Sequence, residues 1–274
     1  MKILKLGQML GGSNAPSPSG GFKNLYSLAF DGVNDFVTCG DADVFTPNTS
    51  GANRGFSLGL WFKTTDASVA GPPPPFGAGS SKFLLGKNNT SLKEYDLQVE
   101  SNGKISMKFY SQGGGLGQGF GELTTSLALN TGDWTHILYT WDLSNDFSGF
   151  KVYVNGTEDA SATITAIGSF TGVANKGAAL QFAQIEGGVG ISNLAASLDE
   201  IFIVDDNLSA SQAADIYNSA TPIDMNTINH LVAWWRNGDT EGPSVFPTIT
   251  DDSSNSNDGT MTNMDSGDIV TDVP

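Results

Sequence analysis

The chain has 274 residues, with 13 Lys and Arg against 29 Asp and Glu, which gives a formal net charge of −16. This excess of negative charge excludes nucleic-acid binding as the main role, because nucleic-acid-binding proteins gain affinity from Lys and Arg that displace counterions. It also disfavours docking on anionic lipid, and no run approaches the roughly 20 apolar residues that a membrane-spanning helix needs. With 34 Gly and 16 Phe, the composition predicts a turn-rich globular protein. The single Cys39 excludes an intrachain disulfide.

The first 21 residues are predicted to form an arm outside the folded domain, which spans residues 22–274. Residues 11–21 read GGSNAPSPSGG, a composition typical of flexible linkers. Lys5 interrupts the apolar stretch at the start of the chain, so no secretory signal peptide is expected. The chain is therefore expected to be made in a cytoplasm. The arm is expected to bind a neighbouring subunit, with folding back on its own domain as the alternative. The apolar side chains for that contact are Ile3, Leu4, Leu6, Met9 and Leu10.

Apolar and polar residues alternate through most of the chain after the linker, which is typical of β-strands. Residues 95–109 alternate on both sides of Asn102 and Gly103, and residues 149–154 run into a second Asn-Gly pair. An Asn-Gly pair between two such runs is the strongest short signal for a hairpin. In residues 56–62, alternate positions place four apolar side chains on one face of a strand. The chain is therefore predicted to consist mainly of antiparallel strands.

Two segments are predicted to be exposed loops and one a helix. Residues 67–80 contain four consecutive prolines, which lack the donor that a strand ladder needs, and residues 112–121 contain six glycines. Ser209 and Gln212 form the capping box of one short helix. The predicted fold class is an all-β, antiparallel β-sandwich of jelly-roll type with one short helix and an extended N-terminal arm.

Several segments stand in an order that resembles a known family. They are LAFDGVNDF at 28–36, FSLGLWF at 56–62, GDWTHILYTW at 132–141, VYVNG at 152–156, SLDEIF at 197–202 and LSASQ at 208–212. This ordered set resembles the laminin-G-like branch of the concanavalin A-like lectin/glucanase superfamily. The resemblance implies a concanavalin A-like sandwich that binds carbohydrate on its concave sheet or on the loops at its rim.

The C-terminal part carries a motif that usually opens such domains. Residues 230–238, HLVAWWRNG, and 251–260, DDSSNSNDGT, resemble the first strand and the Asn/Asp-rich turn of the family. So short a piece cannot bury a core alone, so residues 229–274 are expected to supply outer strands of the same sandwich. The late position of this motif resembles virion structural proteins of tailed phages, particularly marine ones, which implies a place on a virion surface.

Aromatic side chains are the candidate platforms for a glycan, because their rings stack on sugar faces while Asn, Asp and Gly groups bind the hydroxyls. Packing in the core is the alternative for each ring taken alone. The candidates are Trp61, Tyr95, Tyr110, Trp141, Tyr153 and Trp235.

Calcium is the expected cofactor, as a structural ion that the resemblance places between Asp31 and Asp199. The alternative is that Asp31 only starts a turn and Asp199 pairs with a backbone amide. Residues 251–257 space oxygen-bearing side chains two apart, as calcium loops do, but the bidentate Glu of such loops is missing, which favours a solvated turn. One Cys and two distant His residues disfavour a closed zinc site.

No catalytic residue is expected. A glycoside hydrolase needs two carboxylates about 5–10 Å apart across the bond, and glucanase members of the superfamily that this chain resembles carry them on one strand as Glu-x-Asp-x-(x)-Glu. Here Glu94-Tyr-Asp96 is followed by Leu-Gln-Val. Asp199 and Glu200 are adjacent, so they are predicted to point to opposite faces of a strand. A carboxylate pair from different strands stays open as an alternative.

The predicted function is that of a non-enzymatic virion structural protein, a capsid decoration or a tail fibre or spike component, which displays a lectin-like domain to host glycans. Its expected partners are other virion proteins, bound through the arm, a cell-surface glycan, and further copies of itself in a homo-oligomer or lattice. No nucleic acid and no membrane insertion are expected. The alternative function is a free, calcium-dependent carbohydrate-binding lectin, and a polysaccharide hydrolase is less favoured.

Overall fold

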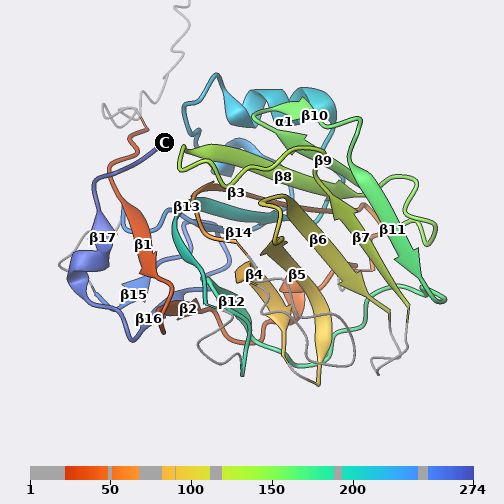
Figure 1. The fold of residues 1–274 in the computed structure, drawn as a ribbon, viewed down its shortest axis with the longest axis horizontal. Coiled ribbons are helices and arrows are strands. Elements are labelled where there is room, and N and C mark those ends of the chain that lie inside the picture. Colours follow the sequence, from red (N-terminus) through yellow and green to blue (C-terminus); the bar gives the residue numbers. More distant parts are fainter. Residues whose placement is uncertain are drawn as a thin grey trace, which may run out of the picture.

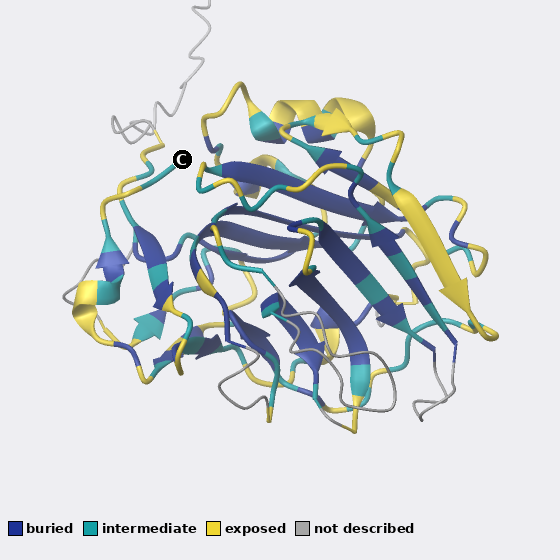
Figure 2. Ribbon diagram, in the orientation of Figure 1, coloured by how far each residue is buried: buried dark blue, intermediate teal, exposed yellow. Residues whose placement is uncertain are grey.

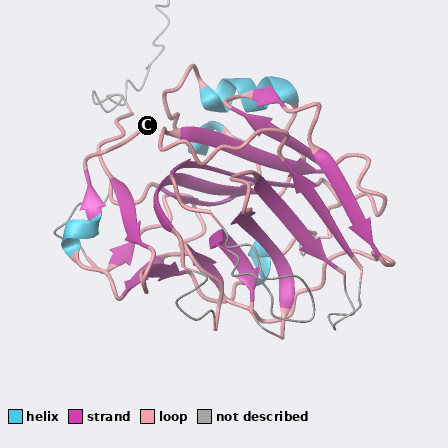
Figure 3. Ribbon diagram, viewed as in Figure 1, coloured by secondary structure: helices cyan, strands magenta, loops and turns pink. Residues whose placement is uncertain are grey.

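Two antiparallel sheets packed face to face make up the described part of the protein (Figure 1). The structure is a computed structural model that describes residues 22–48, 51–67, 82–89, 91–111, 119–187, 193–239 and 246–274. Strands dominate these residues, and one short α-helix lies outside the sheets (Figure 3). The predicted all-β sandwich is therefore confirmed. The N-terminal arm, 1–21, lies outside the described residues, so its predicted contacts stay predictions.

The first sheet has eight strands. In spatial order they are β10 (Thr157–Glu158), β9 (Lys151–Val154), β8 (Thr135–Trp141), β3 (Phe56–Lys63), β13 (Ala195–Val204), β1 (Ser27–Asp31) and β17 (Ile269–Val270), and β14 (Leu231–Trp235) also pairs with β13.

The second sheet has nine strands. In spatial order they are β11 (Thr163–Ile167), β7 (Phe120–Thr124), β6 (Ile105–Tyr110), β5 (Lys93–Val99), β4 (Lys82–Asn88), β12 (Leu180–Phe182), β2 (Phe36–Thr38), β16 (Gly259–Thr262) and β15 (Thr248–Ile249).

Both predicted Asn-Gly hairpins form. One joins β5 to β6, and the other joins β9 to β10. In the second hairpin Asn155 and Gly156 have φ values of 48° and 73°, and two successive positive φ values give the turn the twist that matches its flanking strands. Most of residues 67–80 and 112–121, predicted as loops, lie outside the described residues. The second prediction is wrong at its end, because β7 already begins at Phe120.

Alternation along β3 separates two hydrophobic clusters. Phe56, Leu58, Leu60 and Phe62 point into the main core between the sheets, whereas Trp61 points outward and stacks on Tyr217 of the helix, with ring centroids 5.6 Å apart. Figure 2 shows this division as buried strands in the interior and an exposed outer surface on the helix. The sequence pattern of β3 thus predicts correctly which side chains meet the second sheet.

Helix α1 (Ala210–Tyr217) covers the outer face of the first sheet. Its N-terminus has the predicted capping box, in which Ser209 Oγ accepts from the Gln212 N–H and Gln212 Oε1 accepts from the Ser209 N–H. Ala213 and Ile216 are buried and belong to a second cluster beneath the helix. Short 3-10 helices η1 (Asp43–Phe45), η2 (Met225–Thr227) and η3 (Ser266–Asp268) lie in the connections. Within the described residues, no helix has the length and apolar character needed to cross a bilayer.

The C-terminal residues contribute strands to both sheets. β14 and β17 join the first sheet, whereas β15 and β16 join the second. The turn at 251–257 differs from the solvated turn expected there, because Asp251 is 4 % exposed and accepts the Trp234 N–H at 2.8 Å. Asn255 and Asn257 donate their amide hydrogens to the Val232 carbonyl. The turn therefore binds along β14 and covers its backbone.

Lys87 and Glu94 form an ion pair that is completely buried between β4 and β5, with Nζ 2.8 Å from Oε1. Lys87 Nζ also lies 2.6 Å from Asp41 Oδ1. Glu94 accepts hydrogen bonds from Thr46 Oγ1 at 2.5 Å and from the Lys176 N–H at 2.9 Å. These three partners belong to the connection before β3 and the connection before β12. The ion pair therefore ties both connections to one end of the second sheet.

Replacing Lys87 by Met is expected to lower the free energy of unfolding by about 3–5 kcal/mol, because Glu94 keeps its buried charge without a cation. The measurement is urea denaturation at neutral pH. The matched control is Lys151→Met, which removes the exposed ion pair with Glu158 and is expected to change stability by no more than about 1 kcal/mol. Equal losses in the two variants would contradict the importance of the buried pair.

Candidate functional site

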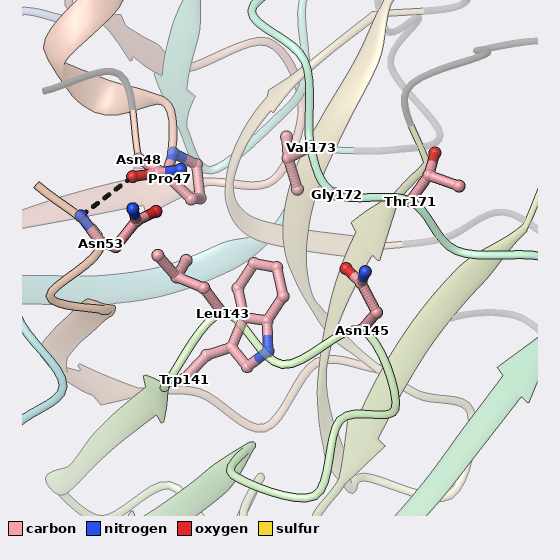
Figure 4. Close-up of a pocket in the computed structure, with 9 residues that line it drawn as sticks. All are labelled: Pro47, Asn48, Asn53, Trp141, Leu143, Asn145, Thr171, Gly172 and Val173. Carbon is pink, nitrogen blue, oxygen red and sulfur yellow. Dashed lines mark hydrogen bonds between the residues drawn. The ribbon is translucent and has the colours of Figure 1, made fainter. Parts of the chain in front are cut away.

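Three connections at one end of the sandwich enclose a cavity of about 220 Å³ (Figure 4). They are the connection before β3, the turn after β8 and the connection between β11 and β12. The lining residues are Pro47, Asn48, Asn53, Trp141, Leu143, Asn145, Thr171, Gly172 and Val173. The volume is below the roughly 300–1,000 Å³ of pockets for drug-sized ligands. The cavity therefore suits one ring of a larger ligand.

An aromatic cluster forms the base of this cavity. Trp141 packs against Phe109 in the core, with ring centroids 4.6 Å apart, and against Phe147 and Phe170 from two of the connections. Phe147 reaches this position because Gly121 has no side chain: a Cβ there would lie 2.0 Å from the ring. The base of the cavity is therefore fixed by core packing, whereas its walls are loops.

The walls carry amide groups and no charge. Figure 4 shows Asn48 and Asn53 on one side of the cavity and Asn145 on the other, with the indole of Trp141 between them. Asn48 and Asn53 have φ values of 65° and 50°, and Asn48 Oδ1 accepts the Asn53 N–H at 3.2 Å. Asn145 and Thr171 are exposed. Such a combination of hydrogen-bonding amides, a hydroxyl and an apolar base suits the polar edge and the apolar face of a sugar ring.

Of the rings predicted as glycan platforms, Trp141 alone lines this cavity. Even Trp141 is 1 % exposed, and its indole N–H donates to the Ser144 carbonyl at 3.0 Å. Its ring is therefore covered, so it supports the base of the cavity from within the core and presents no stacking face to a ligand. The sequence analysis predicts Trp141 as a site residue but none of the other residues that line the cavity. The signal that could have indicated them is the clustering of Asn, Gly and Thr in three loops.

The structure places four other candidate rings inside the protein. Tyr95 and Trp235 are 0 % exposed in the core between the sheets. Tyr153, in the second cluster beneath the helix, is 2 % exposed, and Trp61, which stacks on Tyr217, is 3 % exposed. Tyr95 also donates its hydroxyl to the Phe45 carbonyl at 2.9 Å. Their faces are covered by other side chains, so the structure gives them the packing role that the sequence left as an alternative.

Tyr110 lies on the outer face of the second sheet, where it belongs to a polar network. Its hydroxyl donates to Asp96 Oδ2 at 2.9 Å, and Asn88 Nδ2 donates to the same oxygen at 2.5 Å. Lys93 Nζ lies 5.2 Å from the centroid of the Tyr110 ring. Burial raises the pKa of Asp96, against the opposing effect of Lys108. The Tyr110 ring is thus engaged by Lys93 and Asp96.

The structure does not bring Asp31 and Asp199 together. Asp31 pairs with Ala195 in the register of β1 and β13, which leaves Asp199 four residues farther along β13, or about 13 Å away at the usual strand rise. Asp31 Oδ1 accepts the Val33 N–H at 2.7 Å, as in an ordinary turn. The two carboxylates therefore do not fit a shared calcium ion. Among the described residues, no group of three or more His, Cys, Asp or Glu is arranged to hold a metal.

Asp199 and Glu200 are buried beneath the segment that leads into β1. The expected alternation is interrupted, because the pairing of β13 with β3 shifts after Asp199 and Glu200 has a φ of 48°. Asn24 donates to Asp199 at 2.9 Å, and Trp234 donates to Glu200 at 2.5 Å. Arg236 binds Glu200 and the Lys23 carbonyl. At 0 and 3 % exposure, these carboxylates are not accessible to a polysaccharide.

Burial also shifts the pKa values of three groups in this region. It raises the pKa of Glu200 from 4.5 to about 8, although Arg236 opposes the shift, and it raises the pKa of Asp199 as well. It lowers the pKa of His136 from 6.5 to about 3. The His136 ring lies 5.1 Å from Trp61 and 6.3 Å from Phe202 between ring centroids. His136 is therefore a neutral packing residue.

A family profile and several solved structures resemble the chain. The profile described as the concanavalin A-like lectin/glucanases superfamily matches residues 38–214, which is more than half of the chain. A search of curated proteins gave no match.

Among solved structures, an inferred carbohydrate-binding protein from Bacteroides ovatus has a TM-score of 0.56 at 15 % identity, covering 92 % of this chain and 60 % of its own. The LG4-5 domains of the mouse laminin α1 chain give 0.43 at 15 % identity, covering 77 % and 48 %. A heptameric pentraxin from Limulus polyphemus gives 0.43 at 12 % identity, covering 71 % and 82 %. The chain thus spans about three fifths of the Bacteroides protein. The similarity to that protein supports the assignment of the β-sandwich fold.

The buried Glu200 predicts a pH dependence of stability. Its pKa in the folded protein, about 8, lies above the ordinary 4.5, so the folded state holds the proton more tightly than the unfolded state. The contribution of Glu200 to the free energy of unfolding is therefore largest below pH 4.5 and is lost as the pH rises to about 8. Glu200→Gln, which keeps an acceptor for Trp234, is expected to flatten this fall.

The measurement is urea denaturation of the wild type and the variant at a series of pH values across that range. The exposed control Glu158→Gln is expected to follow the wild-type curve. A Glu200→Gln curve parallel to the wild type would contradict the assignment.

Proposed function

The chain belongs to the concanavalin A-like lectin/glucanases superfamily, and from that premise we propose that it is a non-enzymatic carbohydrate-binding domain whose site is the rim cavity around Trp141. The observation that carries the proposal is the cavity lining, in which three Asn residues and Thr171 surround an indole and no charged side chain takes part. Amides and hydroxyls donate to and accept from sugar hydroxyls, and the partly exposed side chains of Leu143 and Val173 offer apolar contact to the C–H face of the ring.

The absence of charge from the lining favours a neutral sugar. A sialylated or sulfated glycan would bring its negative charge to a protein of net charge −16, without an Arg or Lys among the lining residues to pair with it. Moving that charge out of water without a partner is unfavourable. A neutral hexose or N-acetylhexosamine unit has no such cost, so it is the ligand class that this cavity favours.

The double variant Asn53→Ala/Asn145→Ala is expected to bind neutral glycans at least about tenfold more weakly than the wild type, since each lost hydrogen bond contributes about 0.5–1.5 kcal/mol and 1.4 kcal/mol is tenfold. Both side chains are exposed, but Asn53 has a φ of 50°, where Ala costs about 1–2 kcal/mol. A small fall in the unfolding midpoint is therefore expected, with the protein still folded under the binding conditions. The measurement is binding to an array of neutral, sialylated and sulfated glycans, followed by titration of the best ligand.

The matched control is Asn34→Ala, an exposed amide in the turn between β1 and β2, which is expected to bind like the wild type. The titration is repeated with calcium and with a chelator, which tests the calcium-dependent lectin, and the supernatant is assayed for released reducing sugar, which tests hydrolysis. No binding to any glycan, or binding that the double variant retains, would contradict the cavity as the site.

We further propose that the protein displays this domain on a virus particle, as a capsid decoration or as a fibre or spike component. The support is the order of the sequence motifs, with the opening motif of the family placed last, together with an apolar stretch and a Gly/Ser/Pro linker ahead of Phe22. In this proposal residues 1–21 anchor the chain to other virion proteins through Ile3, Leu4 and Leu6, aided by Met9 and Leu10. Apolar burial of roughly 25 cal/mol per Å² would stabilise such a contact.

Deleting residues 1–21 is expected to abolish incorporation into particles, because the anchoring side chains are removed, while leaving the unfolding transition of the sandwich in place. The measurement is the amount of the protein in particles purified on a gradient. The Asn53→Ala/Asn145→Ala variant serves as the control and is expected to be incorporated normally. Undiminished incorporation of the shortened chain would refute the anchor.

A further inference from the structure

Within the described residues, the two sheets have five edge strands, which differ in how they meet solvent. β10, β15 and β17 have two residues each, and they form three of the four ends of the two strand paths. Very short edge strands offer little backbone for pairing. β14 is longer, but the turn at 251–257 binds its backbone, with the Asp252 N–H donating to the Trp234 carbonyl at 2.8 Å. These edges are therefore protected from further strands.

β11 is the exception. It has five residues, pairs with β7 on one side, and ends the path of the nine-stranded sheet. All five residues are exposed, including Ile164 at 43 % and Ile167 at 53 %. Figure 2 shows the strand exposed over its whole length. Its outward edge is therefore a row of backbone donors and acceptors beside apolar side chains, which is a template for another strand.

The composition around β11 lacks the usual protection against pairing. The sequence Thr-Ile-Thr-Ala-Ile contains no Pro, Lys or Glu, and residues 160–175 carry no charge at all. The chain otherwise has 29 acidic residues and a net charge of −16, so two copies repel each other over most of their surface. An uncharged stretch on a strongly acidic protein is a place where two copies can approach without that repulsion.

We infer that β11 is a self-association edge, which pairs antiparallel with β11 of a second copy of this chain. A twofold axis at Thr165 sets Thr165 of the two copies opposite each other, Ile164 opposite Ala166, and Thr163 opposite Ile167. Each pair is neutral and includes β-branched side chains, which stabilise cross-strand contacts. The same patch serves both copies, as closed twofold symmetry requires. The two nine-stranded sheets then form one continuous sheet.

The expected dimer is weak and reversible. A pairing of two five-residue strands buries less than the roughly 1,200–2,000 Å² of standard stable interfaces. Main-chain hydrogen bonds supply most of the interaction, as in other cases of strand addition. The dimer is therefore expected to dissociate on dilution.

The test is sedimentation velocity of the full chain over a wide concentration series. The wild type is expected to shift from monomer to dimer as concentration rises. Thr165→Lys and Thr165→Glu each place like charges opposite one another across the axis, and each is expected to raise the dimer dissociation constant at least about tenfold. An equimolar mixture of the two variants is expected to regain the dimer, because opposite charges then face each other.

Thr157→Lys, at the exposed edge strand β10 of the other sheet, is the matched control and is expected to dimerise like the wild type. Urea denaturation of each variant confirms folding, and amide exchange that slows at 163–167 with concentration locates the contact. A wild type that stays monomeric, or a dimer that both Thr165 variants retain, would overturn the inference. A monomeric wild type that binds a peptide of residues 1–10 at β11 would also overturn it, in favour of an extended segment as the occupant.

Discussion

The buried ion pair between Lys87 and Glu94 is the constraint on which the cavity end of the molecule depends. Two full charges without exposure are stable only if each is paired and hydrogen-bonded, and here the partners come from two long connections, through Asp41, Thr46 and the Lys176 N–H. The buried charges lose their hydrogen-bonding partners if either connection moves, so the unfavourable desolvation of the charges holds both connections in one position. The cavity walls at Asn48 and Val173 lie on the same two connections. A loop-built site is therefore supported by a feature of the sheet interior.

The central strand β13 has a different role, which is to hold polar groups away from solvent. It pairs with β1, β3 and β14, and its irregularity after Asp199 gives two adjacent carboxylates a common environment beneath Phe22 and Asn24. Arg236 lies beside the stacked rings of Phe22 and Trp234, 4.5 and 5.3 Å from their centroids. This acidic pair is sealed by a cation and aromatic rings, so it contributes to structure and not to hydrolysis.

Much of the fold follows from local sequence signals, because those signals concern neighbours in the chain. The Asn102-Gly103 hairpin, the Ser209–Gln212 capping box and the alternation of β3 all depend on residues within a few positions of one another. The cavity could not be predicted in the same way, since Asn53, Trp141 and Thr171 meet only through pairing of distant strands. Burial of a given Tyr or Trp likewise depends on which face of its strand the opposite layer covers.

The misplaced calcium pair has a similar explanation. The family resemblance predicts a calcium ion between Asp31 and Asp199. The distance between these residues depends instead on the register of β1 against β13, which sets Asp31 opposite Ala195. Alternation failed at Glu200 for a related reason, because a bulge changes the face of every side chain around it. Register and bulges are properties of two strands together, so a single strand's sequence carries little information about them.

The cavity and the exposed edge are linked by covalent structure. The connection that leaves β11 at Ile167 continues to Thr171, Gly172 and Val173, which line the cavity. Two copies paired at β11 would therefore hold their cavities on supports that are joined through one sheet. A cavity that accommodates a single ring binds weakly by itself, whereas two sites at fixed separation convert the second binding event into an intramolecular one. In the proposed function, such a dimer would gain affinity for a surface covered with repeated neutral sugars from geometry and not from new contacts.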